Sequence, residues 1–400
     1  MSSSHGAVVV AITLLIGSAA TLIPSALLSS PCPSNCGTRA TLDAPIFAGL
    51  IVFLSSSLGL LIQAINERRF FCRRAAHYGA ILPAGVFAAV GTLLQLCALL
   101  YIPAAVLAGL RGAFIGGTAI VSARMRLKDA PGSTREWFAV IAAVIGALGV
   151  GAAAASAAYF YPSTANDGEG GAETAGVNAV LLGVAFSLSG YAVATAQVAF
   201  EQHYMESLSF GRWEILGVEG IVASIICGIT LATLASTSSS QGNNTGSNFL
   251  DDSTHTYCCL RDGGAAPITL ALAYGAASMS FNALLLLIAG TRGPNLRVFV
   301  FTARGVLTWI VEIIAAANGS PGGVGRGSSL TLFAILEAAS WVALISGGVL
   351  RVMWQSEREL QEATIMRENN DDGVGVGVGG DDDDDDDDAL LGKRKRLLLQ

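Results

Sequence analysis

Two arginines lie inside long apolar segments of this chain, and each is followed by glycine. Arg111 lies in the run 103–123 and Arg304 in the run 296–317. Each run has about the 20 residues that cross a bilayer as a helix. An arginine at that depth costs about 2.5 kcal/mol or more, so it should face protein or a water-filled cavity. Because a guanidinium binds phosphate or carboxylate through a planar fork of donors, the pair predicts an anion site within the membrane.

Other polar side chains share these apolar segments. Thr308 and Glu312 follow Arg304 at spacings of four and eight, so the three side chains lie on one helix face. Glutamates and amides in other segments add hydrogen-bonding groups at similar depth. We therefore expect one substrate-binding or gating set: Arg111, Arg304, Thr308, Glu312, Glu219, Gln197 and Asn282.

A structural role for the same charges stays open. Glu219, Glu312 and Glu337 could pair with Arg111 and Arg304 and lock the helices together, because buried charges need partners. The sequence offers no sign of an enzyme: it has four histidines and no phosphate-binding loop, zinc-spaced ligand set or Ser-His-Asp grouping. We expect no catalytic residues, no cofactor and no metal. Without an ATP site, transport would be driven by exchange or by an ion gradient.

Composition places the chain in a membrane. It has 400 residues, 52% hydrophobic and 13% charged, with a mean hydropathy of +0.57, whereas soluble domains carry about 25% charged residues. We predict ten transmembrane helices in an all-α integral membrane protein, at 7–28, 46–65, 80–100, 103–123, 137–160, 178–200, 214–236, 266–290, 296–317 and 329–353. The first segment lacks a basic leader, which favours a retained helix over a cleaved signal peptide.

The ten segments divide into two sets of five. Basic residues gather in the loops 66–74 and 124–135, while 31–45 and 161–177 are nearly free of them, so we expect both termini to be cytosolic. The second set then starts from the opposite face, as in an inverted repeat. Aligning Arg111 with Arg304 places them at equivalent positions. The domains expected are a first repeat 1–161, a luminal linker 162–177, a second repeat 178–355 and a disordered acidic cytosolic tail 356–400 that begins as a polar helical stretch.

Four cysteines fall on the expected outer side. Cys32 and Cys36 precede the second segment, and Cys258 and Cys259 lie in the loop 237–265. Disulfides form there, either within a pair or between the pairs. A metal site at His255, Cys258 and Cys259 would need a fourth ligand that the sequence does not provide. On the same side are two glycosylation sequons, at Asn243 and Asn318.

The tail carries most of the net charge of −7, since the segment from Arg367 to Gln400 holds eleven acids and five bases. The short stretch with Asp386, Leu390 and Leu391 has the acidic-dileucine form that sorting adaptors bind; a chance match is the alternative. We expect membrane lipids and a small anion as partners and no nucleic acid, and a homodimer stays open. A second function also stays open, a non-transporting scaffold or regulator that acts through the tail.

Several short motifs resemble one family. They are Ile81-Leu82-Pro83, Leu110-Arg111-Gly112-Ala113, Gln197-Val-Ala-Phe-Glu201-Gln-His-Tyr204, Gly217-Val-Glu219-Gly220, Phe281-Asn282, and Ala303-Arg304-Gly305-Val306 followed by Trp309. From about 80 to 353 their order resembles the drug/metabolite transporter superfamily, in its nucleotide-sugar-transporter-like branch (solute carrier family 35, F-type-like). The resemblance implies ten helices in a five-plus-five inverted repeat and alternating access about a central cavity. We expect a secondary transporter of a small anionic metabolite, nucleotide-sugar-like or phosphorylated, in a Golgi or endolysosomal membrane.

Overall fold

Helices make up the regular structure of this protein. The computed structural model describes residues 3–33, 36, 41–42, 44–67, 75–125, 130–160, 172–207, 210–240, 253–292, 294–317 and 332–372. Within these residues there is no β-strand, only an isolated bridge between Pro31 and Thr41. The helices are α1 (Ser3–Leu28), α2 (Pro45–Glu67), α3 (Ala75–Ala98), α4 (Ala104–Leu110), α5 (Gly112–Met125), α6 (Thr134–Phe160), α7 (Ala172–Ser207), α8 (Arg212–Ser240), α9 (Ser253–Asp262), α10 (Ala265–Arg292), α11 (Pro294–Ala317) and α12 (Leu332–Asp372).

Nine stretches of the described chain are long and apolar enough to cross a membrane, with α4 and α5 counted as one. The expected helical membrane protein is thereby confirmed at this coarser level. The tenth segment expected, 296–317, is present as the helix α11, although it is not one of the nine. The short helix α9 falls in the stretch that the sequence analysis treated as a loop.

The outer faces of the helices are apolar. On α6, Ile141, Ile145 and Leu148 follow one another at helical spacing and are 49%, 62% and 51% exposed. The helices α2 and α8 carry similar exposed rows, for example Ile221, Ile225 and Ile229. Such continuous rows would drive a soluble protein to associate, whereas lipid chains solvate them. The surface is therefore that of a multi-pass membrane protein.

Small residues let the helices approach closely, and the pair α2 and α8 shows this best. A Cβ placed on Gly220 would lie 2.5 Å from the backbone nitrogen of Ser57 and 2.8 Å from the carbonyl oxygen of Phe53. By contrast, nothing lies within 4 Å of a Cβ on Gly228, which follows eight residues later in α8. Because helices in lipid associate mainly through such close packing, any larger residue at Gly220 would require the backbones of α2 and α8 to move apart.

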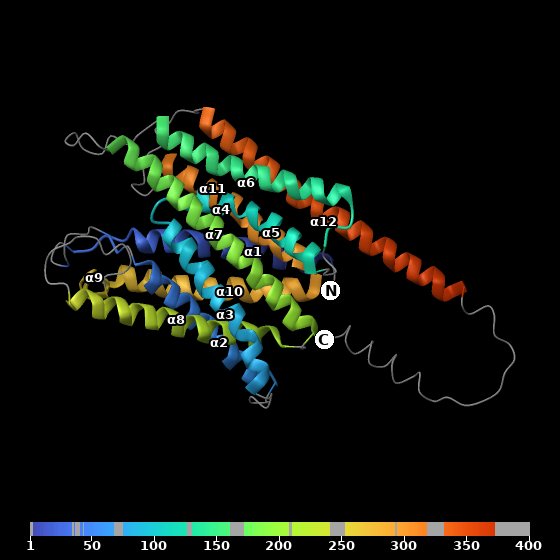
Figure 1. Cartoon of the computed structure of the whole chain (residues 1–400), viewed down its shortest axis with the longest axis horizontal. Coiled ribbons are helices and arrows are strands. Elements are labelled where there is room, and N and C mark those ends of the chain that lie inside the picture. Colours follow the sequence, from blue (N-terminus) through green and yellow to red (C-terminus); the bar gives the residue numbers. More distant parts are fainter. Residues whose placement is uncertain are drawn as a thin grey trace. The chain divides into compact units, whose positions relative to one another are not determined.

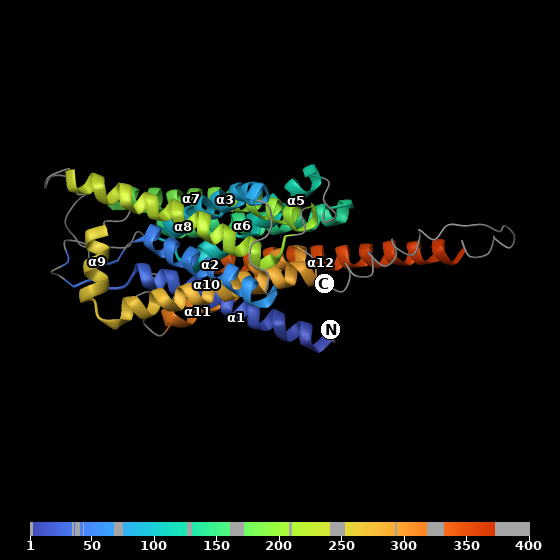
Figure 2. The ribbon, with the colours of Figure 1, turned by 90° about the horizontal axis from the view of Figure 1, so that it is seen from below.

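The chain divides into two compact units, Met1–Trp354 and Gln355–Gln400. In the first unit, α2 packs against α8, α3 against α7 and α8, α1 against α10 and α11, α10 against α2 and α11, and α4 and α5 against α11 and α7. Figure 1 shows these helices running side by side. Figure 2 shows α9 at one end of the first unit, with the start of α1 at the other.

One predicted helix differs in its course. The segment 103–123 was expected to be continuous, but it is broken into α4 and α5 at Arg111. The backbone N–H of Arg111 bonds to the carbonyl of Ala108 three residues earlier, which tightens the last turn of α4. The next residue, Gly112, packs so closely that an added Cβ would lie 2.8 Å from the carbonyl oxygen of Ala143 on α6. Arg111 therefore lies at the end of α4, next to a residue that packs closely against α6.

Candidate functional site

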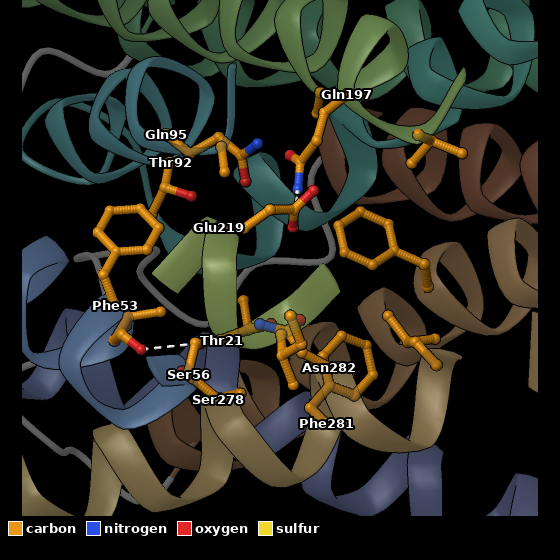
Figure 3. Close-up of a pocket in the computed structure, with 18 of the residues that line it drawn as sticks. Thr21, Phe53, Ser56, Thr92, Gln95, Gln197, Glu219, Ser278, Phe281 and Asn282 are labelled. Carbon is orange, nitrogen blue, oxygen red and sulfur yellow. Dashed lines mark hydrogen bonds between the residues drawn. The ribbon is translucent and has the colours of Figure 1, made fainter. Parts of the chain in front are cut away.

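A cavity of about 180 Å³ lies within the first unit, lined by α1 to α5, α7, α8, α10 and α11. Its apolar wall includes Phe53, Phe114, Phe281 and Phe301. Its charged and amide side chains are Arg111, Arg297, Arg304, Glu201, Glu219, Gln95, Gln197 and Asn282. Figure 3 shows Gln95, Gln197 and Glu219 gathered in one part of this cavity, and Phe281 and Asn282 in another.

Arg111 is fixed by two hydroxyl groups. Its side chain is 3% exposed. Its Nε–H donates to the hydroxyl of Tyr191 on α7 at 3.1 Å, and one terminal nitrogen donates to the hydroxyl of Thr21 on α1 at 3.1 Å. The Tyr191 hydroxyl donates in turn to the carbonyl of Leu107 at 2.8 Å. The guanidinium is therefore oriented by neutral groups that leave its positive charge intact.

Arg304 is held mainly by aromatic rings. Its guanidinium carbon lies 4.0 Å from the centre of the Phe281 ring and 4.4 Å from that of Phe301, and one terminal nitrogen donates to the carbonyl of Gly17 on α1 at 3.3 Å. Its Nε–H has no hydrogen-bond partner in the described part of the chain. The guanidinium of Arg111 also lies over the Phe301 ring, at 5.1 Å. Two buried cations thus share one aromatic ring.

No ion pair joins Arg111 or Arg304 to a carboxylate among the described residues. Two of the three glutamates named as structural partners contact other groups. A carboxylate oxygen of Glu312 accepts from the backbone N–H of Ala105 at the start of α4, 3.1 Å away. Glu219 contacts Gln197 instead, at 3.2 Å. The structure therefore leaves the two cations facing one cavity with neutral neighbours.

One buried ion pair lies in the cavity wall, between Arg297 on α11 and Glu201 on α7. Beside it, the amide nitrogen of Gln197 donates to Glu201 at 2.8 Å and to Glu219 at 3.2 Å. Sequence reasoning left Arg297 and Glu201 out of the candidate set. Their only signals were that Arg297 lies on the same helix face as Arg304, seven residues earlier, and that Glu201 follows Gln197 by four.

Five of the seven side chains expected to bind or gate substrate line this cavity, namely Arg111, Arg304, Glu219, Gln197 and Asn282. The other two, Thr308 and Glu312, are not among its lining residues. Thr308 is fully buried, and its hydroxyl donates to the carbonyl of Arg304 in its own helix at 3.2 Å. In this conformation Thr308 and Glu312 act within the helix packing.

The helix α1 takes part in the site. It provides the hydroxyl of Thr21 and the carbonyl of Gly17 to the two arginines, and a Cβ on Gly17 would lie 2.5 Å from the ring of Phe281. The sequence alone had left this segment open to cleavage as a signal peptide. Its contacts explain why a retained α1 would matter, since both guanidiniums donate to it.

Two disulfides connect the helix α9 to the loop after α1. Cys32 bonds to Cys259 and Cys36 to Cys258, which is one of the arrangements that the sequence left open. Each ring nitrogen of His255 also lies near a carbonyl oxygen of that loop, Nδ1 at 2.8 Å from Cys36 and Nε2 at 3.0 Å from Thr41. Two clusters have the spacing of metal ligands, but each contains the two cysteines of one disulfide, which explains their closeness.

Several predicted features lie outside the described residues. These are the sequon residues Asn243 and Asn318, the polyaspartate stretch, and the sorting motif with Asp386, Leu390 and Leu391.

Comparison with known proteins adds little. No protein-family model matches the chain, and no curated protein matches it. One solved structure, described as "Crystal structure of protein", is similar over 86% of this chain and 98% of its own, at 13% identity and a TM-score of 0.43. A likeness this weak carries no argument about fold or function.

Proposed function

We propose that this protein is a secondary transporter of a small anionic metabolite. One observation carries the proposal: two buried guanidiniums, Arg111 and Arg304, face a cavity between membrane-spanning helices and pair with no carboxylate among the described residues. Their guanidinium carbons lie 5.1 and 4.4 Å from the centre of the same Phe301 ring, and two like charges this close repel by an energy on the order of 2 kcal/mol at an effective dielectric of about 20. An anion between them would relieve this repulsion and satisfy their unused donors.

The size of the cavity favours a small substrate. Its volume of about 180 Å³ is below the roughly 300–1,000 Å³ of pockets that enclose drug-sized ligands. Of the two classes that the sequence left open, a phosphorylated molecule of a few carbon atoms suits this conformation better than a complete nucleotide-sugar. The rings of Phe281 and Phe301 stack with the guanidiniums and keep them in place without neutralising them.

The helix contacts support the ten-helix inverted repeat. If α4 with α5 is counted as the fourth helix and α10, α11 and α12 as the eighth to tenth, each half has five. The first four helices of the two halves then correspond in order: α1 to α7, α2 to α8, α3 to α10, and α4 with α5 to α11. Under this correspondence, the contact of α3 with α7 is equivalent to that of α10 with α1, and the contact of α3 with α8 to that of α10 with α2. The contact of α1 with α11 is likewise equivalent to that of α7 with α4 and α5. The cavity is lined by the first four helices of each half.

The disulfides support the proposed orientation. Both bonds join the segment after α1 to α9, at the opposite end of the unit from the start of α1. Disulfides persist in oxidising compartments, so this end would face the lumen or the exterior and the start of α1 the cytosol. With ten membrane-spanning helices, the C-terminus would lie on the same side as the start of α1, in the cytosol, and an endomembrane is the location we favour.

Transport by purified protein in liposomes tests the proposal. Uptake of labelled orthophosphate, glycerol 3-phosphate and phosphoenolpyruvate should exceed that of neutral nucleosides. Arg304→Ala should lower uptake at least tenfold at equal protein content, and Arg304→Lys should recover part of it, since lysine keeps the charge but loses the fork. Arg124→Ala, which removes an exposed arginine at the end of α5, is the matched control. Uptake by Arg304→Ala equal to that of the control would contradict the proposal.

A further inference from the structure

A second polar centre lines the same cavity as Arg111 and Arg304. It consists of Glu201 and Gln197 on α7, Glu219 on α8 and Arg297 on α11. Glu201 and Glu219 are 1% and 6% exposed. Both carboxylates accept from the same amide nitrogen of Gln197, which holds them next to each other (Figure 3 labels Gln197 and Glu219).

The charges of this centre do not balance if both carboxylates are ionised. Arg297 pairs with Glu201, so one negative charge is compensated. The second carboxylate, Glu219, receives only a neutral amide donor on one oxygen, and its other oxygen, Oε1, has no hydrogen-bond partner in the described chain. A buried anion with one neutral donor is costly, and two adjacent carboxylates rarely both ionise. This centre therefore requires one more positive charge.

The groups that face Glu219 leave a proton as the simplest source of that charge. From α7 come Glu201 and Tyr204, and from α11 comes Arg297, which already has a partner. The neighbouring helices α2 and α3 bring hydroxyl and amide groups, Ser56, Thr92 and Gln95. The helix α10 brings Tyr274 and Asn282, and Arg111 and Arg304 line the same cavity.

We infer that Glu219 and Glu201 form a proton-binding site that couples the movement of the anion to that of a proton. This inference rests on the proposed transport function and names its driving ion. In the protonated state, Glu219 carries no charge, and the centre is neutral as a whole because Arg297 compensates Glu201. In the ionised state, the added negative charge in the cavity opposes binding of an anion at Arg111 and Arg304. Proton and anion would therefore bind together and cross together.

Infrared difference spectroscopy of the purified protein tests the proton site without a substrate. Over the pH range in which the protein stays folded, the wild type should gain the carbonyl band of one buried carboxylic acid as the pH is lowered. Glu219→Gln should lack this band, while Glu362→Gln, which removes an exposed glutamate of α12, should keep it. A wild-type protein without the band in this range, or Glu219→Gln with the band unchanged, would overturn the inference.

Uptake of labelled glycerol 3-phosphate into liposomes tests the coupling. With the pH equal on both sides, exchange reports transport alone. An inward proton gradient should raise wild-type uptake several-fold, and in Glu219→Gln the ratio of uptake with and without the gradient should fall to one. Exchange without any response to the gradient would refute proton coupling and leave the proposed transport function standing. Absence of exchange in the wild type, for this and the other anions named above, would refute both.

Discussion

The buried ion pair between Arg297 and Glu201 allows a quantitative prediction. The two side chains are 13% and 2% exposed, so water screens them little. Opposite charges about 4 Å apart attract by about 4 kcal/mol at an effective dielectric of about 20. This agrees with the roughly 3–5 kcal/mol lost when one partner of a buried pair is removed. We expect Arg297→Gln to destabilise the protein by about that amount.

The neighbouring carboxylate makes the effect asymmetric. Arg297→Gln leaves Glu201 and Glu219 side by side without a cation. Glu201→Gln, in contrast, leaves Arg297 near Glu219, because Gln197 holds the two carboxylates together. The loss of stability should therefore be larger for Arg297→Gln than for Glu201→Gln. The double variant, which removes both charges of the pair, should be more stable than Arg297→Gln alone.

Heating the detergent-purified protein and measuring the fraction that stays monodisperse gives an apparent midpoint for each variant. Because membrane proteins often unfold irreversibly, all variants should be heated at one rate. The control is Arg358→Gln, which breaks a pair with Glu362 whose side chains are 23% and 62% exposed and whose charged atoms are 3.9 Å apart. That pair should contribute about 0.5 kcal/mol or less. Equal midpoints for Arg297→Gln and the control, or a double variant less stable than Arg297→Gln, would refute this reasoning.

Four further predictions concern packing, covalent bonds, capping and orientation. Gly220→Ala should disrupt the contact of α8 with α2 and lower the thermal midpoint. Gly228→Ala should raise the midpoint slightly, because a Cβ there meets no other atom and alanine stabilises a helix by about 0.5–1 kcal/mol relative to glycine. Cys32→Ser should free Cys259 while the second disulfide persists, as mass mapping without reduction would show, and should cost about 2–4 kcal/mol. Glu312→Gln should lower stability by about 1–3 kcal/mol through its weakened bond to the start of α4, and should leave the order of preference among anions unchanged. A tag at the C-terminus should be digested by protease added to cytosol-facing sealed vesicles, and a protected tag would reverse the orientation.

The sequence predicted the spans well because their cause is local. An apolar run of about 20 residues must be a helix in lipid, whatever it packs against. The break at Arg111 was not predictable in the same way. No proline marks it, and the tightened turn in which the N–H of Arg111 bonds to the carbonyl of Ala108 has no local signal in the sequence. The helix α9 was missed for another reason: it is short and polar, and it is tied to the first loop by two disulfides.

In the candidate site, helical spacing alone did not predict which residues line the cavity. The spacing of Arg304, Thr308 and Glu312 established that they share one face of α11, but it could not tell how far that face follows the cavity. In the structure only Arg304 lines it, because Thr308 bonds to its own helix and Glu312 reaches the start of α4. A helix that crosses its neighbours at an angle turns one face toward different partners along its length.

The count of buried charges made from the sequence omitted Glu201 and Arg297. It set three acids, Glu219, Glu312 and Glu337, against two arginines, which made neutralisation a natural alternative. Glu201 and Arg297 lie near the ends of their apolar runs, where charged side chains ordinarily extend to the membrane surface. The structure turns both into the cavity instead and pairs them with each other. Three arginines and two glutamates then line one cavity, and the two arginines that pair with no carboxylate in the described part of the chain are those that the sequence first singled out. Because Arg297 already serves Glu201, any anion that enters meets Arg111 and Arg304 with their charges uncompensated, which is the condition for selective anion binding.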